Sequence, residues 1–339
     1  HAKAISGLGW ARYQEMKYAP AAQAFAQLVE AHPADPLAAE ASYMRGRALE
    51  ADNKPADAAA AYQVALSKYG QSPHAFDAGL QMARVLQKLG KGPEAIAAYE
   101  DLTKRFPQAK QLDVVLYEWA WAVQQKGQDA DAQKIFERLA TQFPGSSLMA
   151  EAVINVCETL FQAKQFADVI ARLKPLLAKE LPPQVREAAL YRLGRTQVEL
   201  GAWSEAKTTL EQLVAGFPSS RLRREAEFWI AEADRQQGQQ KAAVDRLAKL
   251  VAEQVPAEAW LGTAYLRMAQ AQSEQKQWKE MLVTIEQLKK RFPKFEQMNI
   301  AEYHLGRALQ NLARFDEARD AYRRAIAGQK DENAAQCQF

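Results

Sequence analysis

The stretch LAAEASYMRGRALEADNKPADAAAAYQVALSKYGQSP, residues 37–73, decides the fold. Apolar and small residues recur at helical spacing in its first half and again in its second half, which predicts two short helices. Between the two lies the segment DNKP at residues 52–55, where Asn53 tolerates a left-handed backbone and Pro55 cannot continue the preceding helix. The stretch therefore predicts an antiparallel helical hairpin.

The same pattern returns along the whole chain with a period of 37 residues, apart from a single step of 38. The small residue of the first helix stands at Gly9, Gly46, Ala83, Ala120, Cys157, Gly194, Ala231, Ala269 and Gly306. A larger apolar residue, such as Tyr62 after Gly46, follows each small residue sixteen positions later. A second, mostly small residue, such as Ala58, stands twelve positions after the first. Because two helices approach closely only where neither carries a bulky side chain, we expect the helices to meet at the small residues and the larger residue to fill the space beside that contact.

The repeated pattern resembles the tetratricopeptide repeat, a helical hairpin of 34 residues that occurs in arrays. Pro33, Pro107, Pro144, Pro218 and Pro293 stand where that family places a proline after the second helix. The resemblance implies an all-α fold, a right-handed αα superhelix (α-solenoid) of about nine repeats in a single domain. The expected units are 1–36, 37–73, 74–110, 111–147, 148–184, 185–220, 221–257, 258–296 and 297–330, with 331–339 the start of a truncated tenth unit.

The period exceeds that of the common tetratricopeptide repeat by three residues. Asp35-Pro36 and Ser72-Pro73 read as a helix N-cap followed by proline in the first turn, so we expect the first helix of each unit to begin early. Phe-Pro followed by small polar residues, as at 143–147 and 217–220, resembles the repeats of bacterial cell-envelope proteins. Examples are the Tol-Pal-associated division coordinator and the outer-membrane assembly lipoprotein. This resemblance implies a periplasmic or envelope location, with the cytoplasm as the alternative.

Composition narrows the classes of partner. The 44 basic and 41 acidic residues are spread along the chain and give a net charge of +3, which does not favour nucleic acid. No apolar run approaches the length of a membrane helix, so we expect no membrane span. The first helix and the segment 331–339 lack the polar caps of a finished array, so we expect a fragment of a longer protein whose array ends allow self-association.

No pattern in the sequence indicates catalysis. His32, His74 and His304 lie in different units, without cysteine or carboxylate partners at metal-ligand spacing. Phosphate-binding loops, nucleophile elbows and zinc-protease motifs are absent from the sequence. The sequence therefore predicts a protein that is not an enzyme and binds neither a cofactor nor a metal.

Two smaller features read as packing. Cys157 occupies a small-residue position, and we expect it to be a buried thiol. An aromatic residue follows the turn between the two helices in several units, and we expect these rings to belong to the core. They are Tyr18, Phe166, Trp203, Trp278 and Phe315.

A partner-binding surface is the better candidate for function. Side chains three residues before, one after and four after the small position should line the concave side, where tetratricopeptide proteins usually bind ligands. Aromatic and arginine side chains recur there and suit an extended peptide. The candidates are Tyr43, Arg47, Arg84, Tyr117, Trp121, Tyr191, Arg195, Phe228, Tyr303 and Arg307. The alternative is that these side chains stack on the next unit and only close the groove.

The paired asparagines with which chaperone-binding members hold a terminal carboxylate are not matched. We therefore expect a non-enzymatic protein–protein interaction scaffold that binds a protein or peptide partner in the groove. The alternative is a recruiting arm of a larger enzyme or polysaccharide-secretion protein whose functional domain lies outside this chain.

Overall fold

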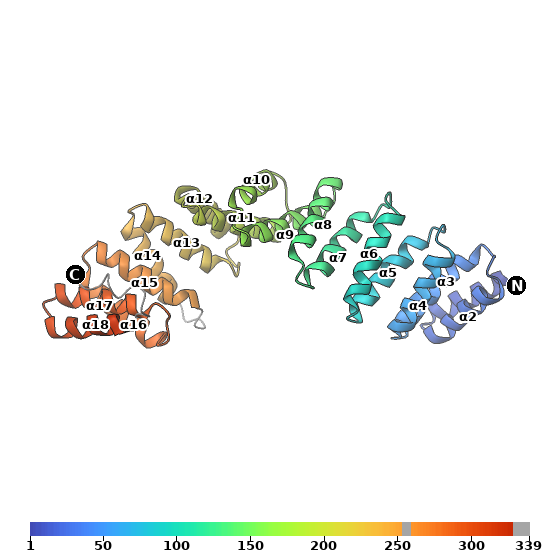
Figure 1. The fold of residues 1–339 in the computed structure, drawn as a ribbon, viewed down its shortest axis with the longest axis horizontal. Coiled ribbons are helices and arrows are strands. Elements are labelled where there is room, and N and C mark those ends of the chain that lie inside the picture. Colours follow the sequence, from blue (N-terminus) through green and yellow to red (C-terminus); the bar gives the residue numbers. More distant parts are fainter. Residues whose placement is uncertain (253–258, 328–339) are drawn as a thin grey trace. The chain divides into compact units, whose positions relative to one another are not determined.

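The computed structural model describes residues 1–252 and 259–327. These residues form α-helices joined by short turns, and no β-strand occurs among them. The fold is an α-solenoid of helix-turn-helix repeats, as predicted (Figure 1). The expected start of a tenth unit at 331–339 lies outside the described residues. Every helix in the described ranges is too short or too polar to cross a lipid bilayer.

The helices alternate between the first helix of a repeat, helix A, and the second, helix B. Helices A are α1 (Ala2–Gln14), α3 (Leu37–Ala51), α5 (Ala75–Lys88), α7 (Leu112–Gln124), α9 (Met149–Gln162), α11 (Pro183–Glu199), α13 (Arg223–Gln236), α15 (Ala259–Glu274) and α17 (Met298–Asn311). Helices B are α2 (Tyr18–Ala31), α4 (Pro55–Lys68), α6 (Gly92–Arg105), α8 (Asp129–Gln142), α10 (Phe166–Leu177), α12 (Trp203–Gly216), α14 (Gln240–Ala252), α16 (Trp278–Arg291) and α18 (Phe315–Ala327).

Contacts divide the chain into two compact units, His1–Thr159 and Leu160–Phe339, which we describe separately. In the first unit each helix packs against its neighbour in sequence, and Phe25, Tyr62 and Tyr99 are fully buried between them. In the second unit the same succession buries Leu210 and Ile285. One continuous array with the nine expected unit boundaries stays a prediction.

The larger residue fills the space beside the small position, as predicted. A Cβ atom placed on Gly46 would lie 2.4 Å from the ring of Tyr62, and one on Gly306 would lie 2.6 Å from the ring of Tyr322. Gly9 faces Phe25 and Gly194 faces Leu210 in the same way. The small position therefore lets helix B pack its largest side chain directly on the backbone of helix A.

The turn between helices A and B carries a second periodic feature. Seven residues after each small position the backbone enters the left-handed region, with φ of 58° at Asn53 and 73° at Gly90. The residues in this conformation are Met16, Asn53, Gly90, Gly127, Lys164, Gly201, Gly238, Lys276 and Ala313. The predicted turn role of Asn53 is confirmed, and the same turn is also imposed on residues that do not favour it.

The start of helix A is capped as predicted in one repeat and differently in another. The Asp35 carboxylate accepts a hydrogen bond from the Leu37 amide at 2.9 Å, and Pro36 has helical dihedral angles. In contrast, the Ser72 hydroxyl is buried and has no hydrogen-bond partner in the described part of the chain, so its predicted capping role is wrong. Serines cap helix A in two other repeats. The hydroxyl oxygens of Ser146 and Ser220 accept hydrogen bonds from the amides of residues 148 and 222 at 3.1 and 2.9 Å.

Cys157 is fully buried, as predicted for its small-residue position. The expectation that the aromatic residues after the turns belong to the core is confirmed for Trp278, which packs against the hydrophobic core of the second unit, and is wrong for Phe315. Tyr18, Phe166, Trp203 and Trp278 are only half-buried, and Phe315 is 65% exposed. Each of these rings belongs to the first residue of its helix B.

Candidate partner-binding face

We call the side chains three residues before, one after and four after the small position of each helix A the A-face. In the first compact unit it includes residues of α3, α5 and α7, and in the second unit residues of α11, α13, α15 and α17. Successive side chains at these spacings lie on one side of a helix, so each helix A contributes a short stripe to its unit.

The stripe of α3 contains Tyr43 and the exposed Arg47, and Tyr62 of α4 lies beside them. The ring of Tyr43 stacks on His74 of the next repeat at 5.8 Å and lies 5.9 Å from the ring of Tyr62. Arg47 donates from Nη1 to the Tyr43 hydroxyl at 3.3 Å, and this bond raises the pKa of Arg47 above its usual value. Tyr62 donates to Glu50 at 3.2 Å. Burial raises the pKa of Tyr62 far above its ordinary value, so the phenol stays protonated.

On α5 the predicted arginine is already bound to its neighbour. Arg84 holds Glu118 of α7 through two parallel bonds, Nε to Oε2 at 2.9 Å and Nη2 to Oε1 at 2.6 Å. Tyr99 donates to the same carboxylate at 3.1 Å. Both oxygens of Glu118 and the fork of Arg84 are therefore used inside the protein, as in the alternative interpretation that these side chains close the groove.

The α7 stripe is aromatic. Tyr117 and Trp121 stand edge to face, with ring centroids 6.2 Å apart, and both contact the buried ring of Phe136. Tyr117 donates to Glu151 of α9 at 2.6 Å. Both rings are half-buried, so this pair presents rigid apolar area. The hydroxyl of Tyr117 is already bonded to Glu151.

In the second unit the arginine of α11 is enclosed. Arg195 pairs with Glu199 at 3.1 Å and with Glu225 of α13 at 3.4 Å, and its guanidinium lies 3.8 Å from the ring centre of Trp229. Burial and a hydrogen bond to Glu225 raise the pKa of Tyr191 far above its ordinary value. Tyr191 and Arg195 therefore join α11 to α13 and leave little of either side chain for a ligand.

Phe228 lies inside the protein, not on its surface. Its side chain is 3% exposed and packs against Trp229 at 4.9 Å and Trp260 at 5.8 Å between ring centroids. The ring belongs to the hydrophobic core of the second unit. We therefore leave Phe228 out of the proposed binding surface.

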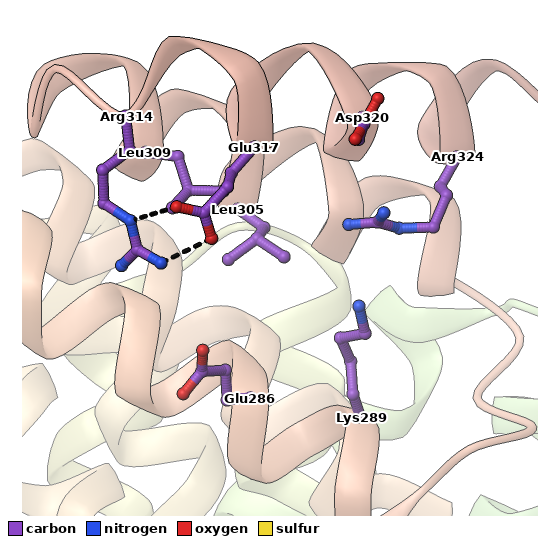
Figure 2. Close-up of a pocket in the computed structure, with 8 residues that line it drawn as sticks. All are labelled: Glu286, Lys289, Leu305, Leu309, Arg314, Glu317, Asp320 and Arg324. Carbon is purple, nitrogen blue, oxygen red and sulfur yellow. Dashed lines mark hydrogen bonds and ion pairs between the residues drawn. The ribbon is translucent and has the colours of Figure 1, made fainter.

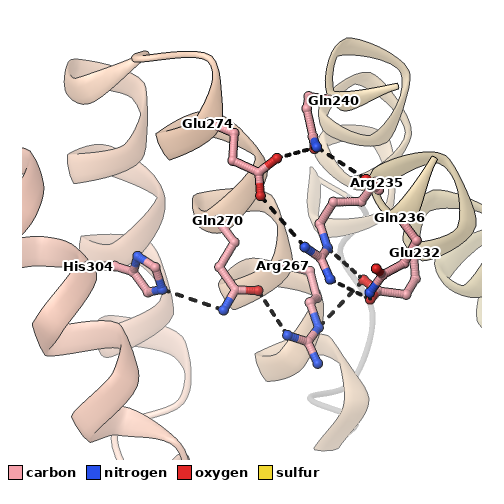
Figure 3. A network of polar contacts seen from close by, with 8 residues as sticks. All are labelled: Glu232, Arg235, Gln236, Gln240, Arg267, Gln270, Glu274 and His304. Carbon is pink, nitrogen blue, oxygen red and sulfur yellow. Dashed lines mark hydrogen bonds and ion pairs between the residues drawn. The ribbon is translucent and has the colours of Figure 1, made fainter. Parts of the chain in front are cut away.

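Figure 3 shows a polar network that crosses the A-face from α13 to α17. Glu232 is 5% exposed and accepts two bonds from Arg235 at 3.0 and 2.7 Å, with Arg267 3.6 Å away. Burial alone would raise the pKa of Glu232, but the bonds from Arg235 and Gln236 and the two arginine charges outweigh it and lower the pKa. The network joins successive helices A through charges that compensate each other.

The same network reaches His304 through Gln270. The side-chain nitrogen of Gln270 lies 3.5 Å from His304 Nε2, and His304 Nδ1 is buried without a partner among the described residues. Burial, with a smaller contribution from the charge of Arg307, lowers the pKa of His304 to about 4. The imidazole is therefore neutral at physiological pH.

On α17 the predicted residues remain accessible. Tyr303 is 43% exposed and its ring lies 6.0 Å from that of Tyr322. Tyr322 donates to Gln310 at 2.8 Å. Arg307 is half-buried, and no carboxylate among residues 1–252 and 259–327 pairs with it.

A separate cavity of about 330 Å³ lies among α16, α17 and α18 (Figure 2). Leu305 and Leu309 form its apolar wall, and Arg314 pairs with Glu317 at 2.7 and 2.5 Å on its rim. Arg324 and Lys289 both pair with Glu302, which is 4% exposed. These charges are engaged with each other, and the cavity lies apart from the A-face.

No group of histidine, cysteine and carboxylate side chains in the described ranges is arranged to hold a metal ion. Three models of the tetratricopeptide repeat match the sequence, at residues 7–73, at 77–109 and 114–146, and at 204–339 as a tetratricopeptide repeat-like domain. The chain belongs to the tetratricopeptide repeat family. No curated protein sequence matches it.

The chain is also similar to several solved structures. BtubC from P. vanneervenii is 12% identical, with 63% of this chain and 91% of that chain covered and a TM-score of 0.50. MamA from Desulfovibrio magneticus RS-1 is 18% identical, covering 56% of this chain and 96% of that chain, with a TM-score of 0.45. YrrB, described as having an unusual peptide-binding site, is 16% identical, covering 59% and 95%, with a TM-score of 0.47.

The structure of this tetratricopeptide array divides the predicted residues into two kinds. Arg84, Arg195 and Tyr191 bind carboxylates of the next helix A, whereas Arg47 and Arg307 do not. The acceptors that make this difference, Glu118 and Glu225, were not among the predicted site residues. Glu118 stands two residues before Ala120, whereas Glu225 stands six residues before Ala231, so no single position of the repeat marks an arginine as internally paired.

Proposed function

We propose that this protein is a non-enzymatic scaffold that binds a protein or peptide partner on its A-face, in the groove predicted from the family. The supporting observation is the stripe of half-buried aromatic side chains in the first unit, with Tyr43 on α3 and Tyr117 and Trp121 on α7. Rigid aromatic area at such spacing suits an extended segment, because little side-chain entropy is lost on binding.

An envelope location in a bacterium belongs to the same proposal and is supported by the Phe-Pro-small-polar segments at 143–147 and 217–220. Fractionation of cells that produce the parent protein tests it. Recovery in the cytoplasmic fraction would contradict it.

Two tryptophans on the same helix provide a matched test of the binding face. Trp121 lies on the A-face, whereas Trp119 packs against the hydrophobic core of the first unit. We expect Trp121→Ala to weaken binding of the partner by about tenfold, as for an aromatic hot spot, with a smaller fall in Tm than Trp119→Ala causes. Trp119→Ala should lower Tm and leave the affinity of the folded protein nearly unchanged.

The measurement is affinity purification of partners from a lysate with the wild-type protein and both variants, followed by titration of the recovered partner. Thermal unfolding of each variant is recorded in parallel. Equal loss of affinity in the two variants, or none in Trp121→Ala, would show that the A-face of the first unit is not the binding surface.

A further inference from the structure

Two repeats, one in each compact unit, share a constellation that the others lack. A tyrosine stands three residues before the glycine of helix A, an arginine one residue after it, and a second tyrosine sixteen residues after it. These Tyr–Arg–Tyr triads are Tyr43, Arg47 and Tyr62 around Gly46, and Tyr303, Arg307 and Tyr322 around Gly306. The other repeats have a different residue in at least one of the three positions.

The two triads also agree in geometry. The two rings of each triad lie 5.9 and 6.0 Å apart between centroids, at interplanar angles of 40° and 51°. In each triad the tyrosine of helix B donates its hydroxyl to the side chain four residues after the glycine, at 3.2 Å to Glu50 and 2.8 Å to Gln310. The tyrosine of helix B in each triad is thus held by a bond that does not involve the arginine.

The arginine of each triad has no anionic partner in the described protein. Arg47 is exposed, and its hydrogen bond goes to a neutral acceptor, the Tyr43 hydroxyl. The Arg47 guanidinium lies 6.0 Å from the centre of the Tyr43 ring. In the second triad the charge of Arg307 opposes the burial that raises the pKa of Tyr322. Arg84 and Arg195 show the opposite state, since a glutamate of the next helix A occupies each of them.

Carboxylates near the first triad cannot replace that missing partner. Glu50 already accepts a bond from Tyr62 and pairs with Lys88 at 3.1 Å, while Glu118 is bound to Arg84 and Glu151 to Tyr117. An unpaired guanidinium has five donors arranged in a fork, and this geometry matches a carboxylate. The tyrosine rings beside it exclude water from one side, which strengthens such a bond.

We propose that each Tyr–Arg–Tyr triad binds the carboxylate of an aspartate or glutamate in an extended acidic segment of a protein partner. Each guanidinium binds the carboxylate of the partner in the way that Arg84 binds Glu118 inside the protein. The chain then has two sites for acidic segments, one in each compact unit. This inference rests on the proposed function, because it names the chemistry of the segment that the A-face binds.

The test uses the whole chain and a capped decapeptide of alternating glutamate and glycine, titrated by calorimetry at low salt. We expect two molecules of peptide per chain, weaker binding as salt is added, and no measurable binding of the same decapeptide with glutamine. Arg47→Gln and Arg307→Gln should each weaken one site by about tenfold, the loss typical of a charge-assisted hydrogen bond, and the double variant should weaken both.

Lys68→Gln is the control, because Lys68 is exposed on α4 and its loss changes the net charge by the same amount. Absence of binding, equal binding of the glutamine peptide, or an equal effect of Lys68→Gln and Arg47→Gln overturns the proposal. A single site that depends on Arg47 alone overturns the assignment of Arg307. Binding of the natural partner that needs Trp121 but neither arginine would overturn this inference while the scaffold function stands.

Discussion

At the scale of single residues, the glycines of helix A are the sites where the sequence pattern has the most direct consequence. Gly46→Ala would place a methyl group 2.4 Å from the Tyr62 ring, which is fully buried and has no room to move. We expect a loss of about 1–3 kcal/mol in the free energy of unfolding, the usual range for overpacking. Urea unfolding of the wild type and the variant measures it.

Gly7→Ala is the matched control on a helix A. A Cβ atom at Gly7 would meet no atom within 4 Å, so the substitution adds only helix propensity. We expect Gly7→Ala to raise the free energy of unfolding by about 0.5–1 kcal/mol. A Gly46→Ala protein as stable as the wild type would show that Tyr62 does not pack on the backbone of α3.

Side chains with the same position in the repeat have different roles. The pattern placed Arg47 and Arg84 on one face, and the structure keeps both there, yet only Arg84 has a glutamate from the next helix within reach. Phe228 shares the position of Tyr43 and is buried. Register determines which side of a helix a residue occupies, whereas its contacts depend on side chains from other repeats.

At the scale of helices and turns, the left-handed residue between helices A and B is a source of strain. Ala313 has φ of 60°, a conformation that costs a residue with a Cβ atom about 1–2 kcal/mol. Because glycine loses more backbone entropy on folding, we expect Ala313→Gly to stabilise the protein by a net amount of about 0.5–1 kcal/mol. The change in unfolding free energy, measured with urea, tests this.

Gly201 allows the reverse substitution at the equivalent turn. Its φ is 69°, so Gly201→Ala should destabilise the protein by about 1 kcal/mol. If both substitutions shift stability in the same direction, the turn geometry is not the cause.

Turns and helix starts differ in how well sequence predicts them. Asn53 was expected at a turn and has positive φ there, as Gly90 and Gly127 do, because these residue types favour the left-handed region. Ser72 has the sequence of a capping residue, but its hydroxyl is buried without a partner. Capping depends on the direction in which the chain enters the helix, which neighbouring repeats influence.

At the scale of the whole molecule, His304 makes the stability of the second unit sensitive to pH. Its pKa is lowered to about 4 in the folded protein, against about 6.5 in an unfolded chain. Between these values the unfolded chain binds a proton that the folded protein does not, so stability falls as pH falls. The full loss is about 3 kcal/mol, reached near pH 4. Urea unfolding at pH 7, 5.5 and 4 measures it.

His304→Gln is the control, because glutamine does not titrate and keeps a polar side chain facing Gln270. We expect the variant to lose much less stability between pH 6.5 and 4. Glu232, whose pKa is lowered, acts in a more acidic window, where its stabilising charge is lost as the carboxylate becomes protonated. An identical pH profile for the wild type and His304→Gln would show that His304 is not the cause.

Local pattern alone was enough to predict the helical hairpins, the packing of the larger residue beside the small position and the family, because each depends on residues within one repeat. The tertiary structure alone distinguished Arg47 from Arg84, buried Phe228 and isolated His304 from partners at Nδ1. Those outcomes depend on long side chains that reach from one helix A to the next. Their pairing is a competition among several neighbours of similar chemistry, and only the folded arrangement of those neighbours decides it.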